Sequence, residues 1–259
     1  MTVTDIRPSR PAPISGNALI LIAAFTALTF ALAWMDEPPG VLTFAFVVVG
    51  WILSVVVHEF AHAYVAHKAG DHTIVEKGYL TLDPLKYTDL TTSILLPLIV
   101  LAVGGIGFPG GAVYLREDLM RSRLGRSMAS LAGPLGTLAV LVALSACLAA
   151  DRAFGVDDSA LARAASFLAF LQGFALVLNL LPLPGLDGFG VIRPYLPPAI
   201  QQGALRLGNL VFIGLFLAIF FVPAVNDALF RTVLAITDLF EVARPEIGAG
   251  LRAFRFWEA

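Results

Sequence analysis

The sequence predicts an all-α protein that crosses a membrane several times, with about six transmembrane helices and a small re-entrant β element between the second and third. Of its 259 residues 58% are hydrophobic and 14% are charged, whereas soluble domains carry about a quarter charged residues. The mean hydropathy is +0.83. The apolar residues are gathered into separate runs near the length that a helix needs to cross a bilayer. We therefore expect one integral membrane domain, residues 1–259, surrounded by lipid.

The first predicted span covers residues 17–34 and follows a polar, proline-containing stretch, residues 1–16, which we expect to be a flexible leader. A signal peptide is the competing interpretation, because arginines precede the span and Ala31-Leu32-Ala33 resembles a cleavage site. The apolar run is longer than the usual core of about 7–15 residues in a signal peptide. A retained helix is therefore favoured.

The second span, residues 41–66, contains the most specific chemical signal of the chain, His58-Glu59-Phe60-Ala61-His62. Residues four apart lie on one face of a helix, so both imidazoles can bind one metal ion with the glutamate beside it. Two nitrogen ligands, a carboxylate that accepts a proton and a third ligand from elsewhere make a catalytic zinc site. Satisfied core histidines are the ordinary alternative. Ionisable groups are costly at membrane depth, however, which favours a functional site.

Residues 70–126 are predicted to contain the re-entrant β element. Residues 78–82 and 111–115 are short, rich in strand formers and bounded by turn residues. Between them residues 93–103 are apolar but contain a proline and are too few to cross a bilayer. A hairpin that enters and leaves the membrane on the same side also keeps the flanking lysines and arginines on that side. Such an arrangement is favoured because Lys and Arg tend to lie on the cytoplasmic side of a membrane. These cations are Lys68, Lys77, Lys86, Arg116, Arg121, Arg123 and Arg126.

Further spans are predicted at residues 127–150, 161–181 and 207–222. Residues 225–240 form a sixth span or, because Asp227 and Arg231 stand at pairing distance in the segment, a helix lying in the interface. Residues 198–259 would be accessory to a catalytic core at 41–197.

The fourth span ends in a proline-rich segment, residues 179–188, that cannot continue a regular helix. Two prolines, Pro182 and Pro184, and two glycines open the backbone just where Asp187 appears. An ordinary turn after a membrane span would have a similar composition. Taken alone, this segment therefore leaves a structural and a functional reading of Asp187 open.

Together, the His58-Glu59-x-x-His62 motif and the Asn179-x-x-Pro182-x-Pro184-x-Leu186-Asp187-Gly188 motif resemble the site-2 protease family of intramembrane zinc metalloproteases. The resemblance covers residues 41–197 and is to the compact members without a PDZ domain. It implies Zn²⁺ held by His58, His62 and Asp187, with Glu59 as the catalytic carboxylate. In the mechanism that follows from this set, Asn179 is expected to hydrogen-bond the substrate backbone or the developing oxyanion. One departure is Thr137, which stands where many members have the asparagine of A-G-P-x-x-N.

The resemblance further implies cleavage of a transmembrane helix in a membrane-anchored, single-pass regulatory protein. The expected location is a bacterial inner membrane, with the active site toward the cytoplasm. No basic stripe or aromatic platform in the sequence indicates nucleic-acid binding.

Two alternatives to this function stay open. The first is a membrane zincin of another type, with Glu76 or Glu117 as the third ligand. The second is a non-enzymatic membrane metal carrier, which would need no Glu59. Metal analysis of variants of Asp187, Glu76 and Glu117 distinguishes the first alternative from a site with Asp187 as the third ligand. A test of proteolysis distinguishes the metal carrier from a protease.

Overall fold

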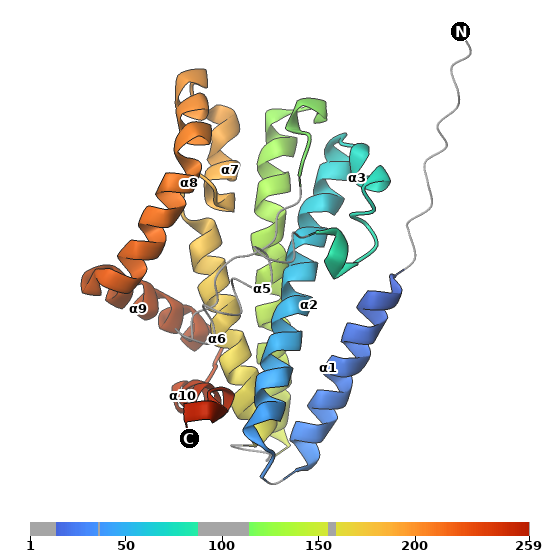
Figure 1. Cartoon of the computed structure of the whole chain (residues 1–259), viewed down its shortest axis with the longest axis vertical. Coiled ribbons are helices and arrows are strands. Elements are labelled where there is room, and N and C mark those ends of the chain that lie inside the picture. The colour runs from blue at the N-terminus through green and yellow to red at the C-terminus, as the bar shows by residue number, and fades with distance from the viewer. Residues whose placement is uncertain (1–13, 36, 88–113, 155–158, 259) are drawn as a thin grey trace.

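The structure is a computed structural model that describes residues 14–35, 37–87, 114–154 and 159–258. Within these ranges the chain is helical and contains no strand (Figure 1). Four of the described helices are long and apolar enough to cross a membrane. They are α1 (Gly16–Trp34), α2 (Gly40–Ala69), α5 (Arg123–Ala153) and α6 (Ala160–Leu180). A fifth is α8 (Pro198–Phe221) if its two segments, bent by 62°, count as one span.

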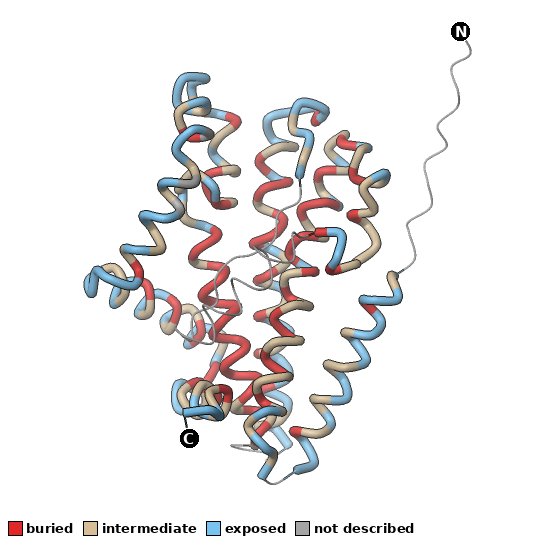
Figure 2. Tube along the Cα trace, in the orientation of Figure 1, coloured by how far each residue is buried: buried red, intermediate tan, exposed pale blue. Residues whose placement is uncertain are grey.

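Helix α6 forms the centre of the bundle. In its most apolar stretch 83% of the residues are buried, against 11% in α1, which stands at the edge (Figure 2). A helix that is apolar on all sides either packs in a core or faces lipid. Here α6 packs in the core, whereas α1 is largely exposed. Small residues let the neighbours approach α6, as at Gly50 of α2, where a Cβ would lie 2.5 Å from Leu168.

The expectation of six spans is not met among the described residues. Residues 225–240 fall in α9 (Pro223–Leu239), which has 17 residues and packs across the middle of α6. The ring of Phe230 lies 5.9 Å from that of Phe170, and a Cβ at Gly173 would contact Val233 at 3.4 Å. Charged residues along α9 make a complete crossing costly. The Arg231 guanidinium donates to the Asp227 backbone carbonyl, not to its carboxylate.

The last helix, α10 (Arg244–Phe254), packs against the beginnings of α6 and α2. Ser166 of α6 donates to the Glu246 carboxylate at 2.6 Å, and the Phe254 ring lies 5.0 Å from that of Phe44 in α2. Beyond α10, a Cβ at Gly40 would overlap Phe256. The carboxyl terminus therefore lies at the end of the bundle where α2 and α6 begin, whereas six spans would place it at the other end.

The strand predicted at residues 78–82 is wrong. The segment is a series of turns after α3 (Thr73–Glu76), with Tyr79 N–H donating to the Ile74 carbonyl. Gly78 and Leu82 have φ angles of 72° and 52°, which extended backbone cannot adopt. Of the other predicted strand only Tyr114 and Leu115 are described, and neither is in a strand. The predicted leader, apart from its last three residues, and the apolar stretch at 93–103 lie outside the described residues.

The connection from α2 to α5 starts and finishes at one end of the bundle, as the charge pattern predicts. Arg121 N–H donates to the Ala69 carbonyl at 3.0 Å, and Lys77 donates to the Tyr114 carbonyl at 2.7 Å. Arg116 N–H donates to the carboxylate of Asp71, which is fully buried. The lysines that follow α2 and the arginines that begin α5 therefore share one side.

The packing of α10 on α6 predicts a difference between two glycines of α10. A Cβ at Gly250 would overlap the Arg163 carbonyl oxygen, whereas at Gly248 the nearest atom would be Arg252 Nη1 at 3.6 Å. We expect Gly250→Ala to destabilise the protein by about 1–3 kcal/mol through overpacking. Gly248→Ala should be neutral or slightly stabilising. Thermal unfolding in detergent measures both, and equal melting temperatures would contradict the close approach of α10 to α6.

Candidate metal centre

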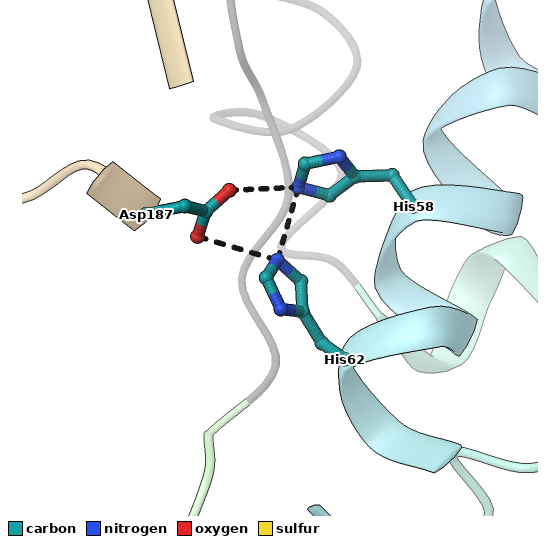
Figure 3. A group of neighbouring side chains, drawn as sticks. All are labelled: His58, His62 and Asp187. Atoms are coloured by element: carbon teal, nitrogen blue, oxygen red, sulfur yellow. Dashed lines mark hydrogen bonds and ion pairs between the residues drawn. The ribbon is translucent and has the colours of Figure 1, made fainter. Parts of the chain in front are cut away.

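Three side chains from two separate elements converge in the bundle. His58 and His62 come from α2, and Asp187 is the first residue of α7 (Asp187–Ile192), which follows the end of α6 (Figure 3). The two histidine Nε2 atoms are 3.0 Å apart. The Asp187 oxygens lie 3.2 Å from His58 Nε2 and 3.3 Å from His62 Nε2. No other group of three metal-ligating side chains this close occurs among the residues that the structure describes.

The size of this triangle fits a zinc ion. Zinc takes nitrogen and oxygen ligands at about 2.0–2.2 Å in a tetrahedron, so neighbouring ligand atoms are about 3.4 Å apart. The three observed separations, 3.0, 3.2 and 3.3 Å, are close to that length. The last two distances involve different oxygens of Asp187, Oδ2 near His58 and Oδ1 near His62. One of these oxygens and the two nitrogens can form one face of the tetrahedron, since three such ligand atoms lie within 4.8 Å of one another. Three protein ligands would leave the fourth position for water or substrate, as catalytic zinc sites do.

The hydrogen bonds behind the histidines direct their Nε2 atoms toward one another. His62 Nδ1 lies 2.7 Å from the Ala129 carbonyl oxygen, which can only accept, so this nitrogen carries the proton. In the neutral ring Nε2 then presents a lone pair. His58 Nδ1 lies 2.9 Å from Thr137 Oγ1. Two ring nitrogens held this way beside a carboxylate form a donor set suited to a cation.

A stripe of small residues on α5 makes room for the two imidazoles. A Cβ at Gly133 would overlap His62 Nε2 and lie 2.6 Å from His58 Nε2, so only glycine fits there. Three residues on, a Cβ at Gly136 would lie 3.4 Å from the His58 Cα. Small residues in a membrane-spanning helix let its neighbours approach closely. Here Gly133 and Gly136 receive the histidines of α2.

The backbone opens after α6 as the two prolines predict. Helix α6 ends at Leu180, and Gly185 has a φ of 98°, in the region that favours glycine. Two residues after Leu186, a Cβ at Gly188 would overlap the Leu180 carbonyl oxygen. The chain thus doubles back over the end of α6. The turn brings Asp187 to the histidines of α2.

Glu59 is 3% exposed and lies on the flank of α2 next to the histidines. Burial raises the pKa of Tyr87, and the negative charge of Glu59 acts in the same direction. Tyr87 donates its hydroxyl to the Tyr79 carbonyl at 2.9 Å. Glu59 therefore lies beside the metal-ligating face of α2, and its charge is felt at Tyr87 beyond α3.

The remaining candidates are not part of the three-residue group. Asn179 is buried in the last turn of α6. Glu76 is exposed and Glu117 forms an ion pair with Arg193, so the geometry favours Asp187 over both as the third ligand. The rings of His67 and His72, the two other histidines of the chain, meet edge to face with their centroids 5.2 Å apart. No third ligand joins them among the described residues.

Sequence reasoning missed the two groups that hold the histidine rings. Thr137 was only a departure from a family pattern, and the Ala129 carbonyl carries no signal in the sequence. Ala129, Gly133 and Thr137 are spaced four apart, so they lie on one face of α5. That spacing was the available clue, but it needs the register of α5 against α2 to become informative.

The chain is similar over nearly its whole length to known bacterial proteins. It is 42% identical over 270 residues to a protein of Mycolicibacterium smegmatis named "Putative zinc metalloprotease Rip2", covering 100% of this chain and 99% of the relative. A Mycobacterium tuberculosis H37Rv protein of the same name is 40% identical over 264 residues, with 99% and 98% covered. "Putative zinc metalloprotease YwhC" of Bacillus subtilis is 32% identical over 183 residues, with 69% and 81% covered.

No family model and no solved structure matches the chain. The similarity to the two Rip2 proteins nevertheless covers nearly all of both chains and so includes α2, α5, α6 and the turn that carries Asp187. The histidine and aspartate side chains also meet at distances that suit zinc. The chain therefore belongs to the site-2 protease family and is a zinc metalloprotease with membrane-spanning helices.

Proposed function

We propose that this protein cleaves a transmembrane segment of a membrane-anchored protein, with Zn²⁺ held by His58, His62 and Asp187. The observation that carries the proposal is the depth of the three-residue group. His58 lies ten residues before Lys68, about 15 Å along the helix axis at 1.5 Å per residue. The group is therefore within the apolar thickness of the bundle. A peptide bond reaches that depth most readily as part of a membrane-spanning substrate.

The proposed chemistry divides between the metal and Glu59. When bound, zinc supplies a Lewis acid that polarises a carbonyl oxygen and acidifies water. Glu59 takes a proton from the attacking water and returns it to the amine as the C–N bond breaks. Asp187 and the histidines hold the metal and transfer no proton. Asn179, buried near the turn that leads to Asp187, is proposed to hydrogen-bond the substrate backbone.

The substrate is proposed to be a single-pass regulatory protein, cut by regulated intramembrane proteolysis. Its helix must unwind locally before cleavage, since a helix uses its peptide groups in its own hydrogen bonds. We place the site toward the cytoplasm of a bacterial inner membrane. Lys68, Lys77 and the arginines that begin α5 lie at the end of α2 nearer His58, and such residues favour the cytoplasmic side.

Glu59→Gln should abolish cleavage and leave zinc bound. Loss of a general base costs about 10²–10⁴-fold in rate, and Glu59 is outside the three-residue metal group. The experiment incubates purified wild type and variant with a single-pass substrate in liposomes and measures zinc by mass spectrometry. Cleavage by the variant at the wild-type rate would refute the role of Glu59. Zinc binding without cleavage by the wild type would favour the metal carrier.

Thr137→Val should weaken zinc binding by about 10- to 100-fold, because it removes the hydroxyl beside His58 Nδ1 at nearly constant volume. Thr137→Ser keeps that hydroxyl and is the matched control. Competition with a chromogenic chelator measures the zinc affinity of each detergent-solubilised protein. Equal affinities of the valine and serine variants would show that this hydrogen bond does not hold the ring.

A further inference from the structure

Helix α7 carries the third member of the metal group but has only six residues, Asp187–Ile192. So short a helix is unstable by itself in solution, and its place depends on what it touches. His58 and His62 are fixed by the long helix α2. The position of α7 therefore decides whether Asp187 closes the triangle.

One side of α7 is held by the first turns of α5. Ser127 donates its hydroxyl to the Val191 carbonyl at 2.6 Å. A Cβ at Gly190 would lie 2.5 Å from Ser130 Oγ, so the backbone of α7 lies directly against the Ser130 side chain. These contacts anchor the second half of α7. Asp187 is at the opposite end of the helix.

The carboxyl-terminal end of α7 is also held by an ion pair between Arg193 and Glu117. Arg193 begins the short helix η4 (Arg193–Tyr195) directly after α7, and Glu117 begins η3 (Glu117–Leu119). The two side chains are 22% and 28% exposed, so the pair is largely shielded from solvent. Removing one partner of a shielded pair leaves the other charge poorly solvated.

Glu117 is itself tied to the end of α2. Its neighbour Arg116 donates its backbone N–H to the buried carboxylate of Asp71 at 2.8 Å. Four residues after Glu117, Arg121 N–H donates to the Ala69 carbonyl. A continuous path of contacts thus leads from the helix that carries the histidines, through Glu117 and Arg193, to the helix that carries the aspartate.

We propose that the Arg193–Glu117 ion pair is a strap that positions α7 so that Asp187 faces His58 and His62. Arg193 and Glu117 are then positioning residues of the metal centre and do not bind the metal. The inference rests on the proposed function of the three-residue group. Glu117, which the sequence leaves open as a direct metal ligand, would then act indirectly, by positioning Asp187 through Arg193 and α7.

The test compares Glu117→Gln and Arg193→Gln with Asp118→Asn in the full-length detergent-solubilised protein. Asp118 lies in the same turn, and its pair with Arg116 is exposed and within one segment. Zinc affinity is measured by chelator competition, and the visible spectrum of the Co²⁺-loaded protein reports the coordination geometry. The two strap variants should bind zinc about tenfold more weakly and alter the spectrum. Asp118→Asn should match the wild type in both measurements.

The reversed pair, Glu117→Arg with Arg193→Glu, should recover much of the lost affinity. If Glu117→Gln does not fold, Glu117→Asp replaces it with the same expected direction, because it keeps the charge on a shorter side chain. If the Glu117 and Arg193 variants lower the melting temperature of the metal-free protein but keep wild-type zinc affinity, the positioning role of the ion pair is refuted. The proposed function is not affected by that result. Wild-type protein that binds neither Zn²⁺ nor Co²⁺ would overturn the proposed function and the strap with it.

Discussion

The close approach of α2 and α5 is the constraint on which the rest of the structure depends. At Gly133 the two helices leave space for two imidazoles and nothing more, since a single methyl group would overlap the ring of His62. Helix α5 also supplies the Ala129 carbonyl and the Thr137 hydroxyl that set the orientations of the two imidazole rings. It also supplies the serines on which α7 rests. One face of α5 therefore positions both elements that carry the candidate ligands.

The sequence predicts the local part of this centre well. Four-residue spacing puts His58 and His62 on one face of any helix, and the prolines after Asn179 require the chain to leave helical geometry before Asp187. That all three meet was an expectation from resemblance to a family. The groups behind the ligands were not predictable, because a hydrogen bond between Thr137 and His58 depends on how two helices are aligned.

The errors in the prediction arise where tertiary contacts override composition. Residues 78–82 have the strand-forming side chains of a β segment, but positive φ angles at Gly78 and Leu82 turn the backbone. The last apolar segment has nearly the length of a span, yet α9 packs across Gly173 of α6. Composition also does not distinguish α6 from α1, although one is almost wholly buried and the other borders lipid. Apolar periodicity reports that a helix is apolar, not what surrounds it.

The docking of residues 256–258 on α2 has a consequence for the order of folding. A Cβ at Gly40, the first residue of α2, would overlap Phe256, so two segments far apart in sequence are in contact. Contacts between residues so far apart in sequence form slowly. The first turn of α2 is therefore expected to be covered only after the helices between these two segments have packed.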